Sequence, residues 1–162
     1  MKSNVSKVLA AVLLCLVLMS AGCSHTSTTV TPAPVVPVDV QIAKYNQIVA
    51  TANQNLVTVV IQLNTAGIIS DANAKTIATY QDSVAKGTAG LATILASNVP
   101  LFDKAIQVQN LALSLVPPAG YKTFGVSTDQ QYQALVLAID AMESTLQIMY
   151  NMAKTVPAPA AQ

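Results

Sequence analysis

The sequence predicts an all-α protein, an antiparallel four-helix bundle with up-down-up-down topology. Apolar residues between positions 39 and 154 recur at alternating spacings of three and four, which is the period of a helix with one buried face. Prolines in this range occur only at 100, 117 and 118, where they divide it into segments of helical length. No segment shows the strict alternation of a half-buried strand, so no sheet is expected.

The first predicted helix covers residues 39–66 and is followed by a short turn. Its buried stripe has an unbroken three-four spacing and consists of Ile42, Tyr45, Val49, Ala52, Leu56, Val59 and Leu63. Gly67 is expected to adopt the left-handed conformation that ends a helix, which would place Ile68 against Leu63 in a Schellman motif. Ser70 would then cap the next helix, and so few linking residues require an antiparallel hairpin.

The second predicted helix covers residues 70–97. Its stripe comprises Ile77, Tyr80, Val84, Gly87, Leu91 and Ile94. Gly87 and Gly90 stand in its middle, where glycine disfavours a helix by up to about 1 kcal/mol relative to alanine. One interpretation is a hinge or a groove that admits a partner backbone. The other, which we favour, is close packing against a neighbouring helix.

The third and fourth predicted helices cover residues 100–116 and 127–154. Pro100 is placed at the first helical position of the third helix, whose buried residues are expected to be Leu101, Ala105, Val108, Ala112 and Leu115. Ser127 and Gln130 have the spacing of a capping box, which predicts the start of the fourth helix. The fourth stripe consists of Tyr132, Leu135, Ile139, Met142, Leu146, Met149 and Ala153.

The N-terminus has the three parts of a secretory signal peptide, assigned to residues 1–22. Lys2 and Lys7 precede an apolar run over residues 8–19, and small residues follow it. A permanent membrane span needs about 20 apolar residues, so this run is short for one. Removal of the peptide is therefore predicted.

The sequence Met19-Ser20-Ala21-Gly22-Cys23 resembles the lipobox of bacterial lipoproteins, with Ser20 where leucine is commonest. The resemblance implies cleavage between Gly22 and Cys23, and acylation of Cys23 by chains such as palmitate. Two or three acyl chains anchor a protein stably to a membrane. Ser24 after the cysteine implies, in a Gram-negative cell, transport to the outer membrane, with the protein facing the periplasm. The resemblance covers about 25 residues and implies nothing about the mature domain.

Residues 23–38 are predicted to be the lipidated cysteine and a disordered, flexible tether. They are rich in serine and threonine and then in proline, a composition that buries little apolar surface. A glycosylated or proline-recognised segment is the alternative. His25, the only histidine, lies here and is expected to be inert. Residues 155–162 are predicted to be a second disordered tail.

Composition excludes several classes of function. The chain has 52% hydrophobic residues, only 9% charged residues and a net charge of +1. All eight basic residues are lysines, and a protein with no arginine and no basic patch is not expected to bind nucleic acid. Cys15 would leave with the signal peptide and Cys23 would be acylated, so no disulfide is predicted.

Metal binding and catalysis are not expected either. Asp140 and Glu143 lie three residues apart on one edge of the last helix, but a di-metal bundle also needs Glu and His on facing helices. No histidine in the folded part is available to activate a serine. The sequence therefore predicts no metal, no cofactor and no enzymatic activity.

Two features remain as candidate binding sites. The loop over residues 117–126 carries Tyr121 and Phe124, which would either anchor a partner or form a lid over the end of the core. Met142 and Met149, with Met152, would either line a pocket for an apolar ligand or belong to the ordinary core.

The outer faces are expected to be rich in uncharged amides, since 21 Asn and Gln side chains outnumber the 15 charged ones. The residues assigned to these faces are Gln47, Asn53, Gln54, Gln62, Asn110, Gln133 and Asn151. The function predicted is a lipid-anchored, non-enzymatic interaction or structural module of the cell envelope, whose partner is an envelope protein or a second copy. The alternative is a carrier of a small apolar or lipid ligand in the bundle core.

Overall fold

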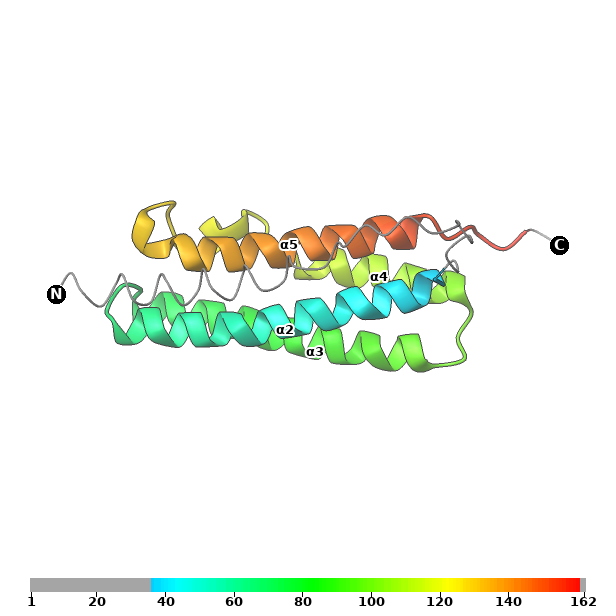
Figure 1. The fold of residues 1–162 in the computed structure, drawn as a ribbon, viewed down its shortest axis with the longest axis horizontal. Coiled ribbons are helices and arrows are strands. Elements are labelled where there is room, and N and C mark those ends of the chain that lie inside the picture. Colours follow the sequence, from blue (N-terminus) through cyan, green and yellow to red (C-terminus); the bar gives the residue numbers. More distant parts are fainter. Residues whose placement is uncertain (1–35, 161–162) are drawn as a thin grey trace, which may run out of the picture. The chain divides into compact units, whose positions relative to one another are not determined.

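The structure is a computed structural model that describes residues 36–160 of the 162-residue chain. The predicted signal peptide, Gly22, Cys23 and the tether up to residue 35 lie outside these residues. Within them the chain forms four α-helices, two short 3-10 helices and no strand, which confirms the all-α prediction (Figure 1).

The four helices lie side by side around one core. They are α2 (Val38–Thr65), α3 (Asp71–Ala96), α4 (Leu101–Leu115) and α5 (Gln133–Lys154). The 3-10 helices η1 (Gly120–Phe124) and η2 (Gln130–Tyr132) lie in the connection before α5. Contacts run from α2 to α3, α3 to α4, α4 to α5 and α5 back to α2, so the helices form a ring.

The predicted stripes supply most of the core. The largest side chains with less than 2% exposure are Ile42, Val49, Leu56, Ile77, Val84, Leu91, Val108, Leu135, Ile139, Met142, Leu146 and Met149. Each belongs to a position that the three-four spacing assigns to the buried face. The helix phases are therefore correct, and packing of these faces stabilises the fold.

The turn between α2 and α3 follows its predicted chemistry. Gly67 has a positive φ of 68°, and its N–H donates to the carbonyl of Asn64 at 2.9 Å. The N–H of Ile68 donates to the carbonyl of Leu63, also at 2.9 Å. These two bonds define a Schellman motif. The hydroxyl of Ser70 accepts from the N–H of Asn73 at 3.1 Å, which confirms the predicted N-cap.

Two expectations at the helix starts are wrong. Pro100 precedes α4 as its cap, and Leu101 is 42% exposed because it lies in the first turn, at an end of the bundle. No capping box starts a helix at Ser127, since α5 begins only at Gln133. The Ser127 hydroxyl instead accepts from the N–H of Asp129 at 3.4 Å, a local turn that competes with helix formation.

Candidate interaction groove between α2 and α3

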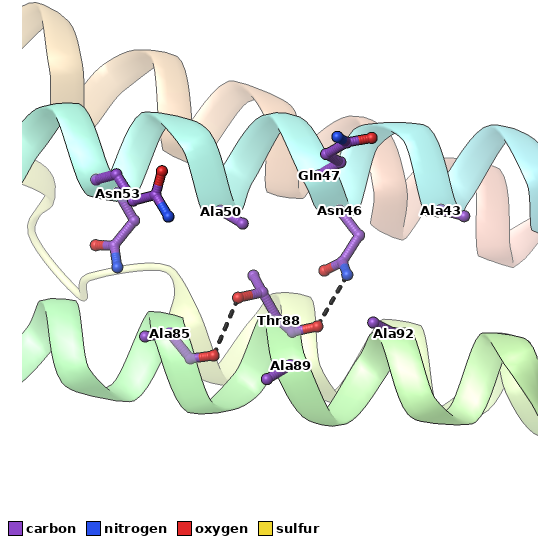
Figure 2. A pocket seen from close by; sticks show the side chains of 10 residues that line it. Ala43, Asn46, Gln47, Ala50, Asn53, Ala85, Thr88, Ala89 and Ala92 are labelled. Carbon is purple, nitrogen blue, oxygen red and sulfur yellow. Dashed lines mark hydrogen bonds between the residues drawn. The ribbon is translucent and has the colours of Figure 1, made fainter.

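The outer surface between α2 and α3 is hollowed into a groove of about 530 Å³ (Figure 2). Small side chains form much of its lining, namely Ala43 and Ala50 on α2 and Ala85, Ala89 and Ala92 on α3. A second cavity of about 250 Å³ continues it towards Asp39 and Ala96. The groove exists because an alanine reaches only as far as its Cβ, so neither helix covers the seam between them.

Two buried asparagines fix the register of the helices beneath the groove. Asn46 donates from Nδ2 to the carbonyl oxygen of Thr88 at 2.9 Å, and Asn53 donates from Nδ2 to the carbonyl oxygen of Gln81 at 2.9 Å. From the first bond to the second, the donor on α2 is seven residues later in the sequence, whereas the acceptor on α3 is seven residues earlier. Helices α2 and α3 therefore run in opposite directions, and both asparagines point from α2 towards α3 in Figure 2.

The polar groups beneath the groove are only partly satisfied. Among the described residues, Oδ1 of Asn46, Oδ1 of Asn53 and Nε2 of Gln81 are buried without a hydrogen-bond partner. Each unsatisfied buried group typically destabilises a fold by about 1–3 kcal/mol. Both asparagines are 5% exposed and line the groove, so it combines apolar walls with unused acceptors.

Charge is sparse along this surface. The lining of the larger cavity contains only alanine, asparagine, glutamine and threonine, and Asp39 lines the smaller one. On the outer side of α3, Lys86 and Asp82 form an exposed ion pair at 2.6 Å. Apolar side chains lie further along α2, where Val40 is 53% exposed and Ile61 is 60% exposed. A partner for this surface would be predominantly uncharged.

The two predicted loop aromatics have different environments. Phe124 is 3% exposed and belongs to the core, whereas Tyr121 is half-buried. The position of Phe124 agrees with the interpretation of the loop as a lid. Its aromatic side chain is not available on the surface as an anchor, and any role of Tyr121 in binding stays a prediction.

The predicted apolar pocket coincides with packed core. Met142 and Met149 are 0% and 1% exposed, and Met152 is half-buried against the same core. Neither Met142 nor Met149 lines the groove or the cavity that continues it. Gly22 and Cys23 lie outside the described residues.

A second polar cluster lies under the loop before α5. The carboxylate of Glu143, on one edge of α5, is partly covered by η1, and a Cβ at Gly120 would lie 3.3 Å from its Oε1. That oxygen is buried and has no hydrogen-bond partner in the part of the chain that the structure describes. Burial raises the pKa of Glu143, and the nearby Asp140 adds to the increase. Burial and the Glu143 carboxylate likewise raise the pKa of the Tyr80 phenol.

Between residues 36 and 160, no three His, Cys, Asp or Glu side chains form a group suited to a metal ion. In the same range, no helix combines the length and hydropathy of a membrane span.

Several buried polar residues were missed by sequence reasoning. Asn53 was assigned to an outer face but is buried, because positions next to the predicted stripe also face α3. A signal existed, since Asn46 and Asn53 are seven residues apart and each adjoins a stripe position. Lys104 is 8% exposed and donates from Nζ to the carbonyl of Leu95 at 2.8 Å, near the C-terminus of α3, where a cation is favourable.

Comparisons of the chain with protein-family models, curated protein sequences and solved structures found no match.

Proposed function

We propose that this chain is an antiparallel up-down-up-down four-helix bundle that acts, without catalysis, as an interaction or structural module at a bacterial cell envelope. The observation that carries the proposal is the open, amide-lined groove between α2 and α3. Small side chains let another helix approach closely, and the exposed amides of Gln47 and Gln54 that line the groove can form hydrogen bonds with it. The partner is an envelope protein or a second copy of the chain.

The address of the module is proposed from the N-terminal sequence. The lipobox-like junction at Gly22 and Cys23 supports cleavage and acylation there. The Ser/Thr/Pro segment up to residue 38 would then hold the bundle away from the membrane surface as a disordered tether. In a Gram-negative cell, Ser24 supports the outer membrane as the destination, with the bundle in the periplasm.

The alternative function, a carrier of an apolar or lipid ligand in the core, has less support. Met142 and Met149, its candidate lining, are fully packed by other core side chains. Native mass spectrometry of the purified full chain distinguishes the two functions. A lipid bound in good yield, in addition to the covalent acyl chains, would favour the carrier, whereas a chain without bound ligand is expected.

Anchoring is tested by Cys23→Ala, with Cys15→Ala as the matched control. We expect Cys23→Ala to lose labelling by a palmitate analogue and to leave the membrane fraction, while Cys15→Ala retains both properties. A parent chain that carries no label, together with unchanged fractionation of Cys23→Ala, would refute the lipid anchor.

In the same cells, a photo-cross-linker at Gln54 in the groove should capture a partner more efficiently than one at the exposed Gln147 on α5.

A further inference from the structure

We propose that the α2–α3 face is the interface of a symmetric homodimer, in which the α2 helices of two copies lie antiparallel about a two-fold axis at the level of Ala50 and Thr51. The inference rests on the proposed function as an interaction module, and it names a second copy of the chain as the partner. Four observations on the face support this arrangement.

The first observation is the symmetry of the outer line of α2. Val40, Gln47, Gln54 and Ile61 recur every seven residues, so they lie along one line of the helix, and all four are exposed. An antiparallel pair centred between positions 50 and 51 places Val40 opposite Ile61 of the second copy. It also places Gln47 opposite Gln54 of the second copy. Apolar residues meet apolar residues, and amides meet amides.

The second observation is charge complementarity on α3. The hydrogen bonds of Asn46 and Asn53 place Asp82 and Lys86 at the levels of α2 positions 52 and 48, on either side of the same midpoint. In this symmetric pair, Lys86 of one copy and Asp82 of the second copy lie at nearly the same level. They differ by about one residue, which is roughly 1.5 Å along the helix. These side chains are 77% and 61% exposed, so both can make the new contact.

The remaining charges of the two helices are less complementary, because Asp39 of the second copy comes to within one residue of the level of Asp71, and Lys44 of the second copy to within two residues of the level of Lys75, diagonally across the two helix pairs. After Lys44, α2 carries no charged residue up to its end at Thr65. The other charged residues of α3, Asp71 and Lys75, come to the levels of Ala96 and Ala92 of the second copy. Charge complementarity is therefore confined to the middle of the face, around Asp82 and Lys86.

The third observation concerns the unpaired amide acceptors. In the proposed register, Gln54 of the second copy lies at the level of Gln47, beside Asn46, and Gln47 of the second copy lies beside Asn53. Each buried Oδ1 that has no partner among the described residues then lies at the level of an amide of the second copy, which reaches it only if the glutamine side chain enters the groove. The alanine walls leave space for the glutamine side chains to enter the groove.

The fourth observation is the size of the face. Helix α2 has 28 residues, which gives it a length of about 42 Å, and two packed helices are roughly 20 Å wide. The footprint is therefore about 800 Å² per copy, which is the area that each partner of a standard stable interface buries.

The register is tested by disulfide cross-linking of the full chain. Gln47→Cys and Gln54→Cys, carrying different tags, are expressed separately and together and then oxidised. We expect a disulfide between the two tagged chains in the mixed cells and little in either single population, because identical positions would lie about 10 Å apart along the axis. The parent chain controls for Cys15 and Cys23, and Gln147→Cys controls for collision between exposed thiols.

The association itself is tested by light scattering on the full-length protein, purified in detergent. The parent is expected to have twice the protein mass of one processed chain. Ala89→Arg on the groove should weaken dimerisation by about tenfold or more, while Ala141→Arg, at an exposed position of α5, should not weaken it. Circular dichroism confirms that each variant is folded.

A monomeric parent, or a mixed population that cross-links no better than the single ones, would overturn the homodimer. Cross-linking of the groove to a different protein or to a lipid would overturn it as well. None of these results affects membrane release by Cys23→Ala, so failure of the dimer is distinguishable from failure of the lipid-anchored module.

Discussion

The ring of Phe124, in the loop before α5, packs against the ring of Tyr80 on α3 with their centroids 5.1 Å apart and their planes tilted by 49°. Tilted aromatic pairs at this distance are favourable beyond the area that they bury. Val126, two residues further along, is also buried at 4% exposure. The loop is therefore attached to the core by its apolar side chains.

Phe124→Ala should consequently destabilise the protein strongly. Removing a buried phenylalanine side chain typically lowers the free energy of unfolding by about 3–5 kcal/mol. Tyr121→Ala, at a half-buried position of the same loop, should have a clearly smaller effect. Urea unfolding of the full chain, followed by circular dichroism, measures both. Equal effects of the two substitutions would contradict the assignment of Phe124 as the loop's core residue.

Helix phases could be predicted from the sequence because they depend on one local property, the spacing of apolar residues. Helix ends depend on competition between local hydrogen bonds and tertiary packing. At Gly67 and Ser70 both favour the same structure, and the predicted motifs form. At Ser127 a local turn replaces the helix start, while Phe124 and Val126 hold the preceding segment on the core.

The groove could not be predicted from the sequence, since it results from two helices together. In the sequence, the alanines of each helix are ordinary outer residues. Only the pairing of α2 with α3 places them opposite one another. Asn53 looked like a surface amide because composition alone does not reveal which side of the stripe faces α3. The polar cluster was missed for a similar reason, because the loop that covers Glu143 is irregular.

The two glycines of α3 provide a matched test of packing. A Cβ at Gly87 would lie 2.8 Å from Cδ1 of Leu111 on α4, whereas a Cβ at Gly90 would have no neighbour within 4 Å. Gly90→Ala should therefore increase the free energy of unfolding by about 0.5–1 kcal/mol, the helix preference of alanine over glycine. Gly87→Ala should gain less or lose stability, because Leu111 must move. A larger gain at Gly87 than at Gly90, measured by urea unfolding, would refute close packing at Gly87.

Core leucines should differ sharply from exposed ones. Leu56 and Leu146 are 0% and 1% exposed, so either Leu→Ala substitution should cost about 2–5 kcal/mol. Leu113 on α4 is 60% exposed, and Leu113→Ala should stay within about 0.5 kcal/mol of the parent. Thermal unfolding of the three variants checks the difference. A large loss at Leu113 would indicate that this side of α4 is covered in solution.

The partly buried carboxyl of Glu143 should make stability depend on pH. Burial, with a smaller effect of Asp140, raises the pKa of Glu143 in the folded state above its value in the unfolded chain. Between these two pKa values the folded state binds more protons than the unfolded state. The contribution of this group to stability is therefore complete below the unfolded pKa, decreases as pH rises through the folded pKa, and is constant above it.

Glu143→Gln should remove this dependence, because the amide keeps the shape of the protonated acid and does not ionise. Relative to the parent, the variant should gain stability as pH rises from about 4 towards neutral, and little below the unfolded pKa of about 4.3. Asp140→Asn in the parent should shrink the effect, since it removes the second cause of the shift. Urea unfolding across this pH range provides the measurement. A difference between Glu143→Gln and parent that does not change with pH would show that Glu143 titrates alike in the folded and unfolded chains.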